Sequence, residues 1–199
     1  MIALTKMDPT LKKICFDYPL LSPGDWYIQA LALKAAANRL DHTKFPIRQD
    51  EDTINHVGSY QMLLSFSFEN LIKGLVVFFR LRQGDTETLV SKHFTHDLGA
   101  LACDPCCAPL KITPHELATL KRLSAYGIWA GRYPRPMREV DVIVKSYGSR
   151  EYTAEKILWD RLSIYLYNRG WIKKWVDKTR YSTILMLKEP DANCIDENN

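Results

Sequence analysis

The sequence contains few glycines, nine in 199 residues, and they are scattered along the chain. Neither a GxGxxG nor a GxxxxGK pattern occurs, which excludes the usual glycine-rich loops that bind the phosphates of dinucleotides and nucleoside triphosphates. A GxSxG pattern is absent as well, so the chain has no nucleophile elbow of the α/β-hydrolase kind. The sequence therefore excludes several large classes of nucleotide-binding protein and hydrolase.

Cysteines are also few, and their number is odd: Cys15, Cys103, Cys106, Cys107 and Cys194. Such a set does not form a complete disulfide framework, and reduced thiols are the simpler interpretation. The first residues, MIALTKMDPTLKK, contain no apolar core of signal-peptide length. The longest uncharged stretch, 53–68, is too short and too polar to span a bilayer. We therefore expect a cytoplasmic protein with no membrane segment.

A strong charge of one sign is missing too, because 27 Lys and Arg face 23 Asp and Glu, for a net charge of +4. Hydrophobic residues make up 46% and charged residues 25%, as in an average globular protein. This composition excludes wholesale disorder, and the length suits one compact domain. We expect residues 1–199 to form a single domain that needs neither a metal nor a disulfide to fold.

Apolar residues recur at helical spacing over most of the chain. The clearest stripe runs from about residue 52 to 80 and comprises Val57, Tyr60, Leu64, Phe68, Leu71, Leu75 and Phe79. Ser22-Pro23 predicts a helix start for 23–40, and the capping box Thr113-Pro114-His115-Glu116 predicts another for 114–130. A short helix capped by Thr95 is expected near residue 96, and a last one is expected over about 154–169.

Two short segments rich in β-branched or apolar residues, 140–145 and 181–187, are candidate strands that could pair. The predicted fold is therefore mainly α, an up-and-down bundle of four to five helices that could include two short strands. Residues 145–180 carry nine basic and four acidic side chains between aromatic residues. We favour an amphipathic C-terminal helix region there over a nucleic-acid grip, followed by a frayed polar tail.

Histidines and cysteines offer two metal hypotheses. A zinc set of His93, His96, Cys103 and Cys106 has suitable ligand types, but free thiols are the preferred interpretation. The stretch His96-Asp97-Leu98-Gly99-Ala100 resembles the HDxGK motif of helical HD-type phosphohydrolases, with Ala100 in place of the lysine. That resemblance implies a metal set of His56, His96, Asp97 and Asp141.

Three stretches, taken together, point to a protein family more specifically than either of these metal patterns does. They are Glu69-Asn70-Leu71-Ile72-Lys73-Gly74-Leu75, then His96-Asp97-Leu98, then Arg132-Tyr133-Pro134. Their order and spacing over residues 22–136 resemble the HEPN superfamily of small helical bundles. The resemblance implies RNA or nucleotide handling, or partnership with a nucleotidyltransferase. The implied binding residues are Glu69, Lys73, His96, Asp97, Arg132 and Tyr133.

The chain departs from the ribonuclease members of that superfamily, in which an arginine precedes a histidine by four to six residues. His42 follows Arg39 too closely, and seven residues separate Arg48 from His56. We therefore expect a non-catalytic module without a cofactor that binds nucleotide, RNA or a partner protein. Because such bundles often pair along a long helix, we also expect a homodimer. The alternatives are the phosphohydrolase, an atypical ribonuclease that uses His96 and Asp97, and a purely structural interaction protein.

Overall fold

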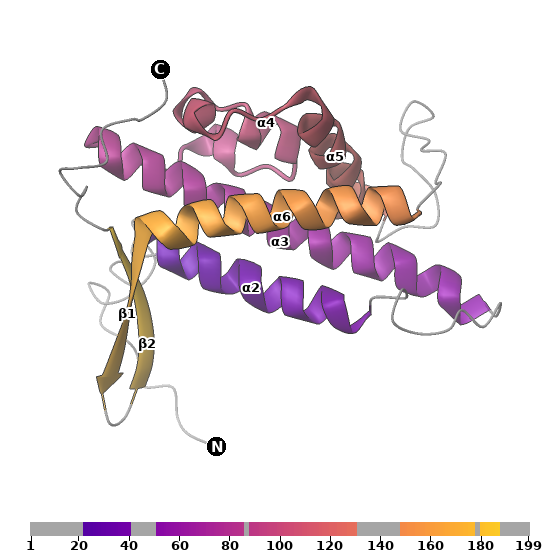
Figure 1. Cartoon of the computed structure of the whole chain (residues 1–199), viewed down its shortest axis with the longest axis horizontal. Helices are drawn as coiled ribbons and strands as arrows, with labels where there is room; N and C mark the ends of the chain where they lie inside the picture. Colours follow the sequence, from indigo (N-terminus) through magenta and orange to yellow (C-terminus); the bar gives the residue numbers. More distant parts are fainter. Residues whose placement is uncertain (1–21, 41–50, 86–87, 131–147, 178–179, 188–199) are drawn as a thin grey trace.

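The computed structural model describes residues 22–40, 51–85, 88–130, 148–177 and 180–187 (Figure 1). Four helices dominate this part of the chain: α2 (Pro23–Arg39), α3 (Glu51–Gln83), α5 (Pro114–Ala125) and α6 (Ser149–Arg169). The shorter helical segments are η3 (Ser91–His93), α4 (Leu98–Ala102), η4 (Pro105–Leu110) and the π-turn η5 (Tyr126–Ala130). Two strands, β1 (Gly170–Asp177) and β2 (Arg180–Leu187), follow α6. The prediction of a mainly α bundle is confirmed.

The directions of the long helices alternate. Pro23 at the start of α2 lies beside Gly74 near the end of α3, and Lys34 further along α2 lies over the ring of Tyr60, 6.0 Å from its centroid. The two helices therefore run antiparallel. Phe68 and Trp159 form an edge-on ring pair with centroids 5.4 Å apart. Phe79 and Tyr165 follow with ring centroids 5.7 Å apart, so α6 runs in the same direction as α3.

Helix α5 completes the up-and-down order by running against α6. Glu116 near its start pairs with Arg161, and Arg122 one and a half turns later pairs with Glu155. The short helix α4 packs on α5, where the Leu98 amide donates a hydrogen bond to the Ser124 hydroxyl over 2.9 Å. Figure 1 shows α4 and α5 together on one side of α3, with α2 on the opposite side.

Helix α3 is the centre of the bundle. No residue from 57 to 81 is exposed, because α2, α4, α5 and α6 all pack against this helix. Residues Val57–Gln83 are long and apolar enough to cross a membrane by length and composition, but 78% of their most apolar window is buried inside the protein. Such burial is typical of the core helix of a bundle. The fully buried α3 core comprises Leu64, Phe68, Leu71, Ile72, Leu75, Val76 and Val77.

The helix starts follow the predicted capping chemistry, with one correction. The Ser22 hydroxyl accepts the Asp25 amide of α2, and Thr113 and Glu116 form the expected capping box of α5. The cap of α4 is Asp97 and not Thr95, because Asp97 Oδ1 accepts the Ala100 amide over 2.9 Å. The Thr95 hydroxyl instead accepts a hydrogen bond from the amide of Asp97, the residue before the first residue of α4.

The last helix, α6, ends where predicted and begins five residues earlier than predicted, but the basic, aromatic region is not helical as far as residue 180. Helix α6 ends at Arg169, and the aromatic segment that follows is strand β1, not a continuation of the helix. It pairs antiparallel with β2 from Gly170 opposite Leu187 to Asp177 opposite Arg180. The predicted strand at 181–187 is therefore present, but its partner is the segment after α6. Residues 140–145 lie outside the described residues.

Candidate functional site

Three of the predicted binding residues meet at the middle of α3. Glu69 Oε1 lies 2.6 Å from Lys73 Nζ one turn further along, and Glu69 Oε2 lies 2.7 Å from His96 Nδ1. Glu69 and Lys73 are almost fully buried, whereas the His96 side chain is 48% exposed. The helix spacing of four residues aligns Glu69 with Lys73, and the turn before α4 brings His96 to the same carboxylate. We refer to Glu69, Lys73 and His96 as the Glu–Lys–His cluster.

Aromatic rings surround this cluster, and the sequence motifs do not include them. Lys73 Nζ lies 5.7 Å from the ring centroid of Trp26 and 6.0 Å from that of Phe94, distances at which a cation is attracted to a ring face. The rings of Phe66 and His96 are 5.9 Å apart. Phe94 is 62% exposed, so one ring of this group is open to solvent.

The hydrogen bond to Glu69 decides which nitrogen of His96 carries the proton. An ionised carboxylate only accepts hydrogen bonds, so His96 Nδ1 must be the donor. In the neutral imidazole, Nε2 then holds a lone pair, and in the charged form it holds a second N–H. An exposed imidazole that a buried carboxylate orients can perform either of two functions. It can bind an anion through Nε2–H, or it can remove a proton through the Nε2 lone pair.

The remaining predicted residues do not join the cluster within the described part of the chain. Asp97 is exposed and serves as the cap of α4. Arg132, Tyr133 and Asp141 lie outside the described residues. His56 is thirteen residues before Glu69 on α3, about 20 Å along the helix axis. The side chain of His56 and the whole of Asp141 lie outside the described part of the chain, so the metal set of the phosphohydrolase hypothesis stays a prediction.

The four residues of the zinc hypothesis have different partners and different exposures in the structure. His96 binds Glu69, whereas His93 turns inward and its Nε2 lies 2.9 Å from Asp104 Oδ2. Cys103 is exposed, and Cys106 is buried. Among the residues that the structure describes, no three His, Cys, Asp or Glu side chains gather in a way that could hold a metal ion.

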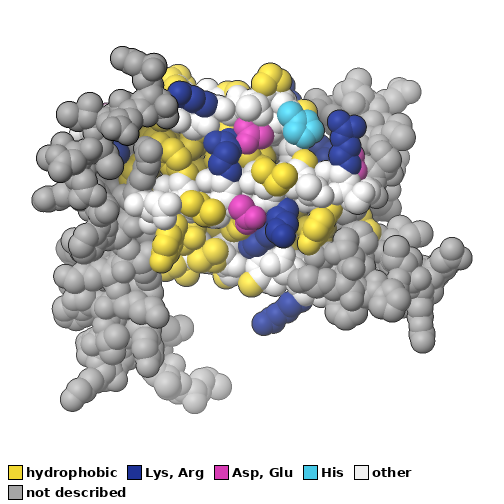
Figure 2. Space-filling model, viewed as in Figure 1, with side chains coloured by type: hydrophobic (Ala, Val, Ile, Leu, Met, Phe, Trp, Pro, Cys, Tyr) yellow, Lys and Arg dark blue, Asp and Glu magenta, His cyan; other side chains and the backbone are white. Residues whose placement is uncertain are grey.

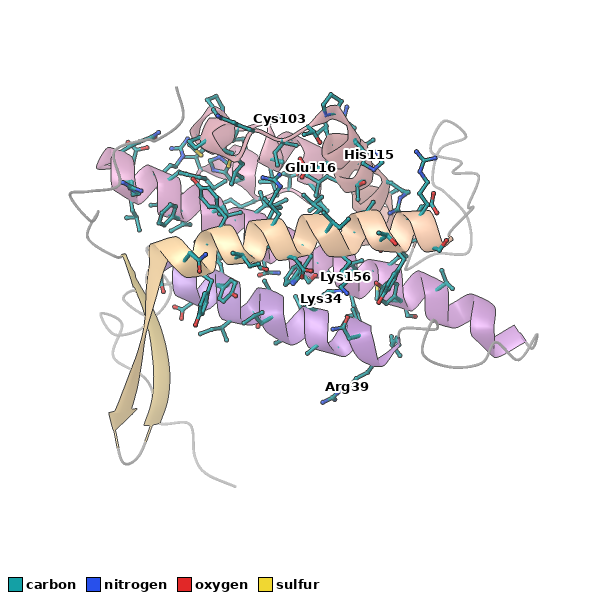
Figure 3. All side chains as sticks on the ribbon, in the orientation of Figure 1. Lys34, Arg39, Cys103, His115, Glu116 and Lys156 are labelled. Atoms are coloured by element: carbon teal, nitrogen blue, oxygen red, sulfur yellow. The ribbon has the colours of Figure 1, made fainter. Side chains whose placement is uncertain are left out.

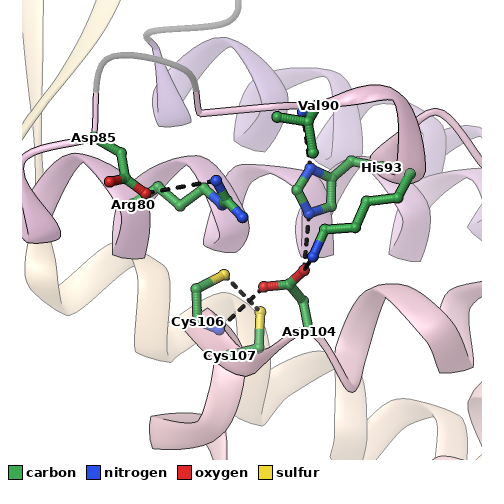
Figure 4. A network of polar contacts seen from close by, with 8 residues as sticks. Arg80, Asp85, Val90, His93, Asp104, Cys106 and Cys107 are labelled. Carbon is green, nitrogen blue, oxygen red and sulfur yellow. Dashed lines mark hydrogen bonds and ion pairs between the residues drawn. The ribbon is translucent and has the colours of Figure 1, made fainter.

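A second polar network surrounds His93 and Asp104, and the sequence did not indicate it (Figure 4). The Val90 amide donates to His93 Nδ1 over 3.0 Å, so His93 Nε2 carries the proton and donates to Asp104. Lys92 Nζ lies 2.6 Å from the same Asp104 oxygen, and the Cys106 amide donates to the other oxygen over 3.0 Å. Asp104 therefore ties together η3, η4 and the turn between α4 and η4.

The charge of Asp104 is favoured by these contacts. Burial raises the pKa of Asp104, but the hydrogen bonds from Lys92, Cys106 and His93 outweigh it and hold the pKa well below its ordinary value. The thiols of Cys106 and Cys107 lie 3.9 Å apart. Their contact, together with burial, raises the pKa of Cys107 far above the ordinary thiol value. Both effects favour the protonated form of the Cys107 thiol. This network is structural.

A third network joins α3, α5 and α6 at the other end of the bundle. Arg122 pairs with Glu155 and donates to Gln61 Oε1 over 3.1 Å, while Gln61 Nε2 donates to Glu155 Oε2 over 3.4 Å. Gln61 and Glu155 are fully buried. Each of these three side chains has a hydrogen-bond partner within the network, which a buried polar network requires if it is to stabilise a fold.

Comparison with protein-family models, with curated proteins and with solved structures found no match to this chain. The HEPN resemblance therefore rests only on the sequence motifs at Glu69–Leu75, His96–Leu98 and Arg132–Pro134.

Proposed function

We propose that this chain is a HEPN-like helical-bundle module that binds the phosphate groups of a nucleotide or of RNA at His96. One observation carries the proposal: Glu69, Lys73 and His96, from two of the three motifs, form one hydrogen-bonded cluster. Glu69 uses one carboxylate oxygen on Lys73 and the other on His96, and the His96 side chain remains 48% exposed, so a ligand can reach its ring.

The chemistry of the cluster suits a phosphate-bearing ligand. With Nδ1 bound to Glu69, a protonated His96 directs its Nε2–H outward, where it can donate to a phosphate oxygen. Phe94, two residues before His96, is 62% exposed and offers a ring on which a base can stack. Lys73 is occupied by Glu69, so its role is to hold the carboxylate in place and not to contact the ligand.

Binding is tested by fluorescence anisotropy with a labelled single-stranded RNA of about 12 nucleotides, and by calorimetry with adenosine monophosphate, at one fixed salt concentration. His96→Ala removes a charge-assisted hydrogen bond of about 1.5–3 kcal/mol, so the Kd rises about 10- to 100-fold. His115→Ala is the matched control, because His115 is exposed near the start of α5 (Figure 3), whereas the α5 residue bonded to Leu98, two residues after His96, is Ser124.

Two results contradict the proposal. One is a wild-type protein that neither RNA nor nucleotide stabilises against thermal unfolding, which favours the purely structural alternative. The other is an equal effect of His96→Ala and His115→Ala, which places the ligand elsewhere.

A second candidate function, RNA cleavage by an atypical ribonuclease, is favoured by the orientation of His96. In its neutral form the Nε2 lone pair can take the proton of a ribose 2′-hydroxyl, whose oxygen then attacks the adjacent phosphorus. The bond from phosphorus to the 5′-oxygen breaks, the 5′-oxygen takes a proton from water, and a 2′,3′-cyclic phosphate remains. Cleavage that persists in EDTA and disappears in both His96→Ala and Glu69→Gln supports this function. Binding without cleavage leaves the non-catalytic module.

A further inference from the structure

Two cysteines of η4 are adjacent in the chain and face each other inside the protein. Charged and hydrophobic side chains are interspersed on the outer face that Figure 2 shows, whereas Cys106 and Cys107 lie beneath the surface, 6% and 1% exposed. Their thiol sulfurs are 3.9 Å apart (Figure 4). Successive side chains of a 3-10 helix normally point about 120° apart, because the helix has about three residues per turn. Both thiols have therefore turned toward each other.

The surroundings of the pair make Cys106 the sulfur that reacts first. The contact with Cys106, together with burial, favours the protonated form of Cys107, so the Cys107 S–H donates in this contact and Cys106 Sγ accepts. Cys106 is also the more exposed of the two residues, so a small oxidant that reaches η4 meets it before Cys107. Cys103, labelled in Figure 3, is exposed at the C-terminal end of α4 and provides an accessible thiol for comparison.

The backbone of the two cysteines is bonded to Asp104. The Cys106 amide donates to Asp104 Oδ1 over 3.0 Å, and the Cys107 amide donates to the Asp104 carbonyl oxygen over 2.8 Å. The other carboxylate oxygen of Asp104 accepts from His93 and Lys92. A change in the peptide between residues 106 and 107 therefore reaches η3 through one side chain.

We propose that Cys106 and Cys107 are a modification site, a dithiol that hydrogen peroxide oxidises to a disulfide between adjacent residues, and that this closure loosens η4 from Asp104. The inference does not depend on the proposed RNA or nucleotide binding. An S–S bond is about 2.05 Å long, so the two sulfurs approach by about 2 Å and the 106–107 peptide becomes part of a ring. Rotation of this peptide redirects the two amides that Asp104 now accepts.

The oxidation takes place in two steps. Cys106 Sγ loses its proton to water and attacks one oxygen of hydrogen peroxide; the O–O bond breaks, Cys106 becomes a sulfenic acid, and the released hydroxide takes up a proton to form water. Cys107 Sγ then attacks the Cys106 sulfur and the S–O bond breaks. The departing hydroxide takes the Cys107 proton and leaves as a second water. The two thiols together lose two electrons, and the peroxide gains them.

The decisive experiment treats the folded whole chain with hydrogen peroxide, unfolds it in iodoacetamide and analyses the tryptic peptide 93–111, which contains all three cysteines of this region, by mass spectrometry. The expected product has lost two hydrogens, about 2 Da, takes the alkyl group at neither Cys106 nor Cys107, and reverts in dithiothreitol. Cys103→Ser is the matched control and should keep this product, whereas Cys106→Ser should lose it. In Cys107→Ser the sulfenic acid of Cys106 has no partner thiol and should be trapped by dimedone.

Melting followed by circular dichroism shows whether the closure reaches Asp104. The oxidised wild type should melt about 2–8 °C below the reduced protein and recover in dithiothreitol, and Cys106→Ser should show no such shift. The wild-type measurements stand even if a serine variant does not fold. The modification site is overturned if Cys106 and Cys107 still take the alkyl group at a peroxide dose that oxidises Cys103, or if the disulfide joins Cys103 to either of them. A disulfide that forms between Cys106 and Cys107 without lowering the Tm overturns the loosening of η4.

Discussion

Asp104→Asn tests whether the buried network around His93 stabilises the fold. The asparagine side chain has the same size, but it carries no charge and only one acceptor oxygen, so an N–H donor replaces either the oxygen that accepts from His93 and Lys92 or the oxygen that accepts from the Cys106 amide. The His93 hydrogen bond has a charged acceptor and is buried, so its loss costs about 1.5–3 kcal/mol. The Lys92 side chain is 55% exposed, and its ion pair adds at most about 1 kcal/mol.

The expected total is a decrease of about 2–4 kcal/mol in the free energy of unfolding at pH 7, which corresponds to a fall of about 5–15 °C in Tm for a chain of this length. Urea unfolding followed by circular dichroism measures the first quantity, and calorimetry measures the second. Asp85→Asn is the matched control, because Asp85 forms a half-exposed ion pair with Arg80 at 3.5 Å. That substitution should cost less than about 1 kcal/mol.

The pH dependence provides an independent check. The folded protein holds the pKa of Asp104 below its ordinary value, so the unfolded chain binds more protons as the solution becomes acidic. The stabilising effect of Asp104 is therefore fully present above the unfolded pKa of about 3.9 and is lost as the pH falls below it. The difference between wild type and Asp104→Asn should be constant near neutral pH and should shrink below about pH 4. A cost no larger than that of Asp85→Asn, or a difference independent of pH down to about pH 3, refutes the reasoning.

Two further substitutions test local packing and capping. A Cβ at Gly127 would lie 2.6 Å from the Ser65 hydroxyl, so Gly127→Ala should cost about 1–3 kcal/mol in urea unfolding and less in a Ser65→Ala background; equal costs in both backgrounds would contradict this contact. Thr113→Ala removes the cap of α5 and should cost about 1 kcal/mol, measured by the same unfolding assay. Burial raises the pKa of Glu116, but hydrogen bonds from Thr113 and Arg161 outweigh burial and lower the pKa. The part of the cost that comes from the Thr113 hydroxyl bond to the Glu116 carboxylate should therefore decline in acid; a cost that does not fall at all between neutral pH and about pH 3 would contradict this contact.

Much of the fold could be predicted from helical periodicity and capping. The stripe from Val57 to Phe79 predicts the central helix, and all of its members except the half-buried Val57 belong to the buried core. The capping box at Thr113 is local chemistry and appears as predicted. Strand β1 was not predicted, because its residues were interpreted as the aromatic end of an amphipathic helix and their pairing with β2 is a contact between segments. Local propensity does not encode that contact.

Only some contacts of the candidate site could be predicted from the sequence. The contact between Glu69 and Lys73 follows from their spacing, whereas the contact with His96 depends on how the chain returns to α3 after 27 residues. The sequence does not predict the His93–Asp104 network, because η3 and η4 are 3-10 segments of three and six residues, too short for a hydrophobic period. The only available signal was the aspartate before Pro105, whose side chain accepts the Cys106 amide.

The central position of α3 has a consequence for synthesis of the protein. Its apolar surface is complete once Gln83 has been translated, but α6, which covers part of it, is complete only at Arg169. At about 5–20 residues per second, the nascent chain exposes a helix of membrane-spanning length for roughly 4–17 seconds before its last partner helix is made. During this interval, of its α-helical partners, only α2, α4 and α5 can cover the apolar surface of α3.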